Sequence, residues 1–194
     1  EIILVTIAGE DKPGVTSTIT SILAKYGVTI LDIGQAVIHD NLSLGILIEI
    51  PRPSESSPVL SDVLFQMHAL GMNTKFEPVL EQDYQRWVDG QGKARHIITL
   101  LARKVSANHI SKVTCIAAKH GLNIDNISRL SGRIHLDDDL DRTRSCMEVS
   151  VRGTPSESLR EEFLKAASDL DVDIAFQKDD IFRRNRRLVV FDMD

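Results

Sequence analysis

Two acidic residues near the end of the sequence have a spacing suited to phosphoryl transfer. Asp192 and Asp194 follow four apolar residues, 188–191, which read as a strand buried on both faces. Because residues two apart on a strand point the same way, both carboxylates would face one spot. One carboxylate could attack phosphorus while the other moves protons, with a magnesium ion, Mg2+, offsetting the negative charge. The alternative interpretation is an acid pair that only ends a strand.

A second candidate site is the turn at residues 11–14, which has the sequence Asp-Lys-Pro-Gly and precedes an amphipathic helix starting near Val15. A helix start presents free backbone N–H groups, and Gly14 would let a ligand approach them closely. A carboxylate could bind there while Asp11 takes an ammonium group, and a free amino acid carries both charges. Asp11 is also a candidate helix cap, and Pro13 suits a first helical turn. The alternative is a capped turn without a ligand.

The elements that position this turn follow the β-α-β-β-α-β order of the split ferredoxin-like arrangement. Apolar periodicity predicts strands at residues 2–7, 28–38, 42–50 and 72–80, and helices at residues 15–26 and 60–70. Gly27 supplies a residue that can end the first helix in the left-handed conformation. Residues 97–102 then match residues 3–8 without a gap at a shift of 94, and the shift reaches 100 by residue 163. The sequence therefore predicts two copies of one α+β module with antiparallel sheets, the second carrying a six-residue hairpin insertion.

The repeat divides the chain into five parts. We expect a first module at residues 1–80, a linker at 81–94, a second module at 95–178, a basic connector at 179–187, and a strand at 188–194 that opens an α/β domain. The insertion carries an acidic run at 137–141, for which a solvated turn is favoured over a calcium loop. The basic run at 182–187 is interpreted as an interdomain connector rather than a nucleic-acid patch.

Composition excludes several classes of partner. The 194 residues carry a formal net charge of −5, which disfavours nucleic acid and anionic membranes. No apolar run approaches the roughly 20 residues that span a bilayer. Cys115 and Cys146 lack metal-ligand spacing, and we interpret them as reduced core residues of a cytoplasmic protein.

The βαββαβ order with the turn at residues 11–14 resembles the ACT domain, a family of small-molecule-sensing regulatory modules. The resemblance implies an amino acid bound between paired modules, and a homodimer formed through them. The implied ligand-binding residues are Asp11, Pro13, Gly14 and Val15 on the turn, with Ile33 and Gly34, or Asn126 and Ile127, on the strand side. The second copy departs from the pattern, because residues 103–108 lack Pro-Gly. Ser106 or Asn108 could cap its helix, so we expect one asymmetric site or a structural second copy.

The run at 188–194 resembles the first motif of the haloacid dehalogenase superfamily. That resemblance implies that Asp192 is the nucleophile, that Asp194 is the general acid/base, and that Mg2+ is bound by the Asp192 side chain and the Asp194 main-chain carbonyl.

Two ACT-like modules ahead of this motif resemble the bacterial phosphoserine phosphatases with tandem ACT domains. The resemblance implies hydrolysis of O-phospho-L-serine, L-serine as the regulatory ligand, and no activity in these 194 residues alone. The alternatives are a non-catalytic amino-acid-sensing regulator, such as a transcriptional modulator, and a pure dimerisation module.

Overall fold

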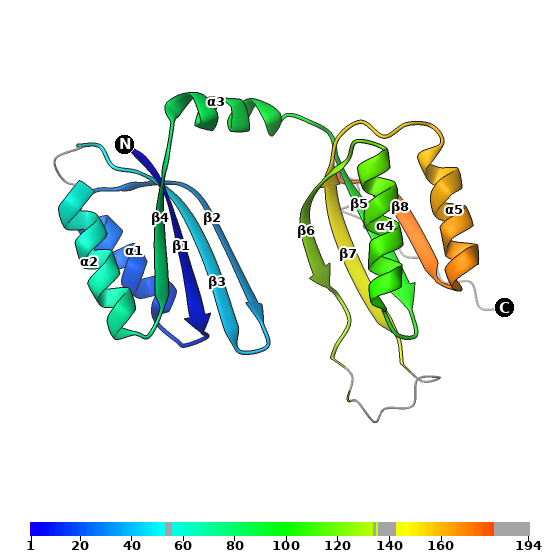
Figure 1. Ribbon diagram of the computed structural model, residues 1–194, viewed down its shortest axis with the longest axis horizontal. Helices are drawn as coiled ribbons and strands as arrows, with labels where there is room; N and C mark the ends of the chain where they lie inside the picture. The colour runs from blue at the N-terminus through cyan, green and yellow to red at the C-terminus, as the bar shows by residue number, and fades with distance from the viewer. Residues whose placement is uncertain (53–55, 134, 136–142, 181–194) are drawn as a thin grey trace. The chain divides into compact units, whose positions relative to one another are not determined.

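A computed structural model describes residues 1–52, 56–133, 135 and 143–180 (Figure 1). The chain divides into two compact units, residues 1–91 and residues 92 onward. Each unit holds one four-stranded antiparallel sheet and two helices packed on one face of that sheet. The predicted pair of ferredoxin-like α+β modules is therefore confirmed.

The first module has the sheet order β2-β3-β1-β4. Its elements are β1 (Ile2–Glu10), α1 (Val15–Lys25), β2 (Thr29–Ile38), β3 (Asn41–Glu49), α2 (Ser56–Ala69) and β4 (Asn73–Val79). The core forms where one face of β1 and β3 meets the two helices, and alternation along β3 buries Leu42, Leu44, Ile46 and Ile48. The edge strand β2 is exposed along almost its whole length.

The ends of α1 correct one prediction and confirm another. The helix begins at Val15 with Gly14 as its N-cap and makes no side-chain capping hydrogen bond, so Asp11 does not cap it and Pro13 precedes it. At the other end Gly27 has φ 64°, and the Val28 N–H donates to the Leu23 carbonyl at 3.1 Å. Gly27 therefore ends the helix in the left-handed conformation, as predicted.

The second module has the sheet order β6-β7-β5-β8. Its elements are β5 (Arg95–Ala102), α4 (Ala107–Lys119), β6 (Asn123–Arg129), β7 (Ser145–Arg152), α5 (Leu159–Leu170) and β8 (Asp173–Lys178). Cys115 is exposed on α4 and Cys146 is half-buried on β7, so the prediction of core cysteines is wrong. The sheet-facing side of α4 is occupied instead by Val113, Ile116 and Ala117.

The gapless match between the two copies is wrong by one residue in the first strand. A shift of 94 places the buried Ile7 on Leu101, which is 36% exposed. The β5 side chains that join the helix-packed core are Ile98, Leu100 and Ala102. Since neighbouring side chains on a strand point to opposite faces, the structural match in β5 is a shift of 95, which places Ile7 on Ala102. The helices keep the shift of 94, because α4 ends before Gly121 as α1 ends before Gly27.

Between the modules, the stretch predicted as a linker contains a helix. It is α3 (Glu81–Gly90), none of whose residues is buried. The acidic run at 137–141, the basic run at 182–187 and the strand at 188–194 lie outside the described residues.

Candidate functional site

The turn between β1 and α1 presents an open helix start. Gly14 has φ 99° and ψ −13°, a conformation that glycine adopts without strain, and its carbonyl accepts from the Thr18 N–H at 2.8 Å. The first helical turn contains no acidic side chain. Because no side chain caps α1, its first N–H groups and the positive end of its dipole are available to an anion.

Two contacts hold this turn against β2 and β3. The Asp11 N–H donates to the Asp40 carbonyl at 2.8 Å, which ties the turn to the β2–β3 hairpin. The Thr16 hydroxyl donates to the Gln35 side-chain oxygen at 2.7 Å, which ties the first turn of α1 to β2. The Asp11 side chain is exposed, whereas Val15 is 1% exposed and packs in the core. Asp11, Pro13 and Gly14 are thus accessible, and Val15 can offer only its backbone.

The predicted strand-side residues of the first module lie on the edge of its sheet, because β2 pairs with β3 alone in the part of the chain that the structure describes. Ile33 is 46% exposed beside Gly34, whose register partner on β3 is Gly45. A Cβ added at either glycine would meet no atom within 4 Å. The two glycines therefore make a strip without side chains, which another backbone or a ligand could approach.

The corresponding turn of the second module is closed by its own side chains. Ser106 is the N-cap of α4, and its hydroxyl accepts from the His109 N–H at 3.3 Å. In return the His109 Nδ1 accepts from the Ser106 N–H, also at 3.3 Å. This reciprocal capping box confirms the prediction that Ser106 could cap the helix. Asn126 and Ile127 lie on the edge strand β6, where Ile127 is 42% exposed.

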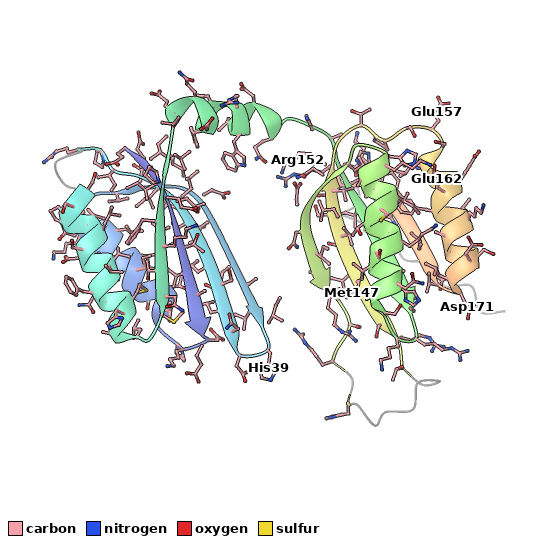
Figure 2. All side chains as sticks on the ribbon, viewed as in Figure 1. His39, Met147, Arg152, Glu157, Glu162 and Asp171 are labelled. Atoms are coloured by element: carbon pink, nitrogen blue, oxygen red, sulfur yellow. The ribbon has the colours of Figure 1, made fainter. Side chains whose placement is uncertain are left out.

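One carboxylate links the two helices in each module, Asp62 in the first and Glu162 (labelled in Figure 2) in the second, and the sequence patterns did not reveal it. In the first module the Tyr26 hydroxyl donates to the Asp62 carboxylate at 2.6 Å, which raises the pKa of Tyr26 and lowers the pKa of Asp62. In the second, Glu162 accepts from Lys119 at 2.7 Å and lies 3.2 Å from the His120 Nε2. The Lys119 hydrogen bond, followed by that of His120, lowers the pKa of Glu162. These contacts fix α1 to α2 and α4 to α5.

The predicted catalytic and metal-binding residues, Asp192 and Asp194, lie outside the described residues. Within the described ranges, no group of three or more His, Cys, Asp or Glu side chains is arranged to hold a metal ion. In that same part of the chain, no helix combines the length and apolar character needed to cross a bilayer.

Comparison with known families supports the assignment of the two modules. Residues 1–77 match a model described as an ACT domain, and residues 94–177 match a second model with that description. Both modules are ACT domains. The open β1–α1 turn of the first domain and the capped turn of the second are therefore two versions of one structural position.

The tandem ACT domains are related to phosphoserine phosphatases. The chain is 31% identical over 198 residues to phosphoserine phosphatase SerB2 from Mycobacterium tuberculosis, with 99% of this chain and 44% of that protein covered. It is 28% identical over 192 residues to phosphoserine phosphatase from Streptomyces coelicolor, with 99% of this chain and 43% of that protein covered. The chain therefore spans less than half the length of these relatives.

Among solved structures, an unknown protein from Galdieria sulphuraria has a similar fold. The TM-score is 0.70 at 15% identity, and the match covers 92% of this chain and 98% of that chain. At this identity the likeness concerns the fold alone.

Proposed function

We propose that this chain is the amino-acid-sensing region of a phosphoserine phosphatase, and that L-serine is its ligand. The observation that carries the proposal is the uncapped start of α1 behind Gly14, on a chain related over its whole length to phosphoserine phosphatases. Serine is the product of that hydrolysis, and binding it in the regulatory region would couple the enzyme to its own product.

In the proposed site the ligand carboxylate accepts hydrogen bonds from the first N–H groups of α1, where the helix dipole favours an anion. The exposed Asp11 carboxylate takes the ammonium group. Gly14 leaves this approach without a side chain, and a Cβ added there would have only the Ser17 hydroxyl as near as 4.0 Å.

The strand side of the site is proposed to come from a paired module in a homodimer. Ile33 and Gly34, or Asn126 and Ile127, lie on edge strands whose outer sides pair with no other strand among the described residues. Edge strands with exposed apolar side chains favour pairing with another chain.

The proposed activity of the longer protein is hydrolysis of O-phospho-L-serine in the cytoplasm. The Asp192 carboxylate attacks phosphorus, the bond from phosphorus to the serine oxygen breaks, and Asp194 gives its proton to that oxygen. Asp194 then takes a proton from the water that hydrolyses the aspartyl-phosphate. The Asp192 side chain and the Asp194 main-chain carbonyl are the groups that would hold Mg2+, which would supply positive charge to offset the phosphoryl group. The 194 residues alone are expected to be inactive, because two acids cannot position a substrate.

Titration calorimetry of the 194-residue protein with L-serine tests the sensing proposal. Asp11→Asn should weaken binding by about tenfold, the loss expected for one charge-assisted hydrogen bond. Glu49→Gln is the matched control, since it removes an exposed carboxylate at the opposite end of β3 and should leave the affinity unchanged. If wild-type protein does not bind L-serine, the sensing proposal fails and a dimerisation module becomes the better interpretation.

A further inference from the structure

The helix α3 lies beside one end of the first sheet and leaves a groove there. It follows β4 after a single residue and belongs to the same compact unit as the first module (Figure 1). The groove has a volume of about 390 Å³, and residues from the start of α3 and from the sheet line it together. Volumes of this size are typical of small-molecule sites.

The floor of the groove is apolar and lies on the face of the sheet that α1 and α2 leave uncovered. Ile2 pairs with Glu49 on β3 and with Val79 on β4, so these three residues form one row across the sheet. Since the neighbouring Ile3 points into the helix-packed core, the side chains of this row point to the opposite face. Ile2, Val79 and the nearby Leu31 are half-buried and line the groove.

The wall contributed by α3 carries an aromatic ring. Tyr84 lines the groove half-buried, and its ring centroid lies 5.9 Å from that of Trp87. Leu80 also lines the groove although it is 68% exposed, so apolar surface remains open to solvent. The face of an aromatic ring attracts cations, and an apolar floor favours a ligand with an alkyl body.

The charged side chains that line the groove are all carboxylates, and in the described part of the chain no Lys, Arg or His lines it. Glu49 and Glu81 are exposed, and neither forms an ion pair with a described residue. The third carboxylate, that of Glu1, accepts from the Ser56 hydroxyl at 2.5 Å. The Glu1 amino group donates to the Ile50 carbonyl at 2.9 Å. Glu49 and Glu81 are therefore the two carboxylates available to a cationic ligand.

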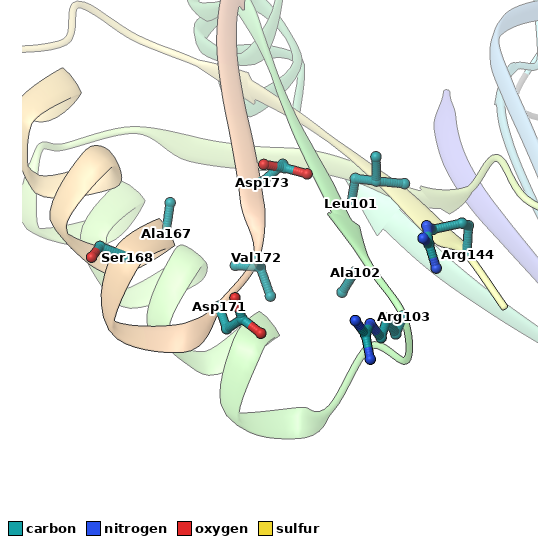
Figure 3. A pocket seen from close by; sticks show the side chains of 9 residues that line it. All are labelled: Leu101, Ala102, Arg103, Arg144, Ala167, Ser168, Asp171, Val172 and Asp173. Carbon is teal, nitrogen blue, oxygen red and sulfur yellow. The ribbon is translucent and has the colours of Figure 1, made fainter. Parts of the chain in front are cut away.

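The cavity of about 460 Å³ in the second module has a different charge pattern (Figure 3). Arg103 and Arg144 line it together with Asp171 and Asp173, so its lining has no excess of either sign. Both arginines already take part in interactions within the protein, and the Arg144 guanidinium donates to the Thr143 carbonyl at 2.8 Å. The groove at α3 differs because its carboxylates have no cationic partner among the described residues.

We propose that the groove at α3 binds a small aliphatic diamine. Its methylene chain lies on the apolar floor, and its two ammonium groups lie against Glu49 and Glu81. A metal ion would leave the floor exposed to water, and the carboxylate of an amino acid would be repelled by the acidic lining. The groove shares no residue with the turn at residues 11–15, so this site is separate from the proposed L-serine site and takes a different class of ligand.

The test is a titration of the 194-residue protein with 1,4-diaminobutane, followed by the fluorescence of Trp87, the single tryptophan of the chain. The Trp87 ring lies beside Tyr84, so an occupied groove should change its emission. Butylamine keeps the alkyl chain but has one ammonium group, and it should bind roughly three- to fivefold more weakly, the factor expected for one exposed ion pair. The uncharged 1,4-butanediol and magnesium chloride, all at one ionic strength, should leave the emission unchanged.

Variants of two neighbouring acids assign the groove. Glu81→Gln removes a carboxylate that lines it and should weaken diamine binding roughly three- to fivefold. Asp83→Asn is the matched control, because it removes the other acidic side chain in the first turn of α3, which does not line the groove, and it should leave binding unchanged. Glu49→Gln should weaken the binding of the diamine but not of L-serine, and Asp11→Asn should do the reverse, so the failure of either site is seen separately.

Four results would overturn the diamine site. They are Trp87 emission that does not respond to 1,4-diaminobutane, an equal response to butanediol or magnesium, equal binding of butylamine, and equal effects of the Glu81 and Asp83 variants. Trp87 emission that changes with protein concentration alone would show that a second copy of the chain fills the groove, and would also exclude the diamine as its occupant.

Discussion

Gly14→Ala gives the sharpest test of the open turn, because Gly27→Ala supplies a matched control on the same helix. Both glycines have positive φ, 99° at Gly14 and 64° at Gly27. A Cβ at Gly14 would meet only the Ser17 hydroxyl, at 4.0 Å, and a Cβ at Gly27 would meet nothing within 4 Å. Neither substitution causes a clash within the protein, so both affect stability through backbone conformation.

Both substitutions should destabilise the first module, Gly14→Ala at least as much as Gly27→Ala, because φ 99° lies further than φ 64° from the values that L side chains adopt. Placing a side chain in the left-handed region costs about 1–2 kcal/mol. Replacing glycine by alanine recovers about 0.4–1 kcal/mol by restricting the unfolded chain. The net loss is therefore about 1 kcal/mol, which corresponds to a fall in Tm of roughly 4–8 °C for a domain of this size. Thermal unfolding followed by circular dichroism should show this fall in the first module for both variants.

The effect on binding should differ. At Gly14 the new Cβ narrows the approach to the first N–H groups of α1, and the loss of one charge-assisted hydrogen bond costs about 1.5–3 kcal/mol, or roughly 10- to 150-fold in affinity. At Gly27 the Cβ lies at the far end of α1, so the calorimetric affinity for L-serine should remain within about twofold of wild type. Equal losses of affinity would mean that stability, not access, explains the Gly14 effect. Unchanged affinity in both variants would remove the turn from the ligand site.

Three further results are expected. Ser106→Ala should destabilise the second module by about 1 kcal/mol, because α4 loses its N-cap, and a Tm unchanged within error would contradict the capping role. Glu162→Gln should destabilise the protein at neutral pH, because it removes the carboxylate that pairs with Lys119 and His120. The folded-state pKa of Glu162 lies below its usual 4.5, so its contribution is present above that pH and is lost as pH falls further. Urea unfolding at several pH values should therefore show wild type and variant converging in acid. Ile33→Lys, on the exposed edge strand, should shift the protein toward monomer in sedimentation experiments, and a persistent dimer would exclude that edge.

Periodicity was enough to predict the order of the elements in both modules, and the error in matching the first strands of the two copies has a simple cause. Alternating apolar residues in β3 and the helical stripe in α1 each bury one face, so element type and order follow directly from the pattern. In β5, residues 97, 98, 100 and 101 are all apolar, and a match by residue type cannot distinguish the two faces. The exposed fractions show which side chains face the core, since Leu100 is 0% exposed and Leu101 is 36% exposed. A shift of one residue places every side chain of a strand on the opposite face of the sheet. The helices of the two copies match at a shift of 94, so they give no sign that β5 needs a different shift.

The sequence located the turn before the first helix of each module, but it did not show which of these helices has a side-chain cap. Asp11 was a reasonable cap by residue type, yet the positive φ of Gly14 starts α1 without a side-chain cap. At the equivalent place in the second module, the partner of Ser106 is His109, a residue that the usual Ser-x-x-Glu signature does not include. Capping depends on backbone angles at one residue, which composition around the turn does not determine.

The two modules have diverged in opposite directions, and this argues that they have different roles. The first leaves its helix start open and fills the base of its core with Met67 and Met72. The second closes its helix start with Ser106 and leaves a charged cavity beside Ala167. At the end of α5 the left-handed residue is Asp171, whereas Gly27, Gly71 and Gly121 stand at the matching helix ends. Asp171→Gly should therefore raise the Tm of the second module, and an unchanged Tm would mean that aspartate adopts this conformation without cost.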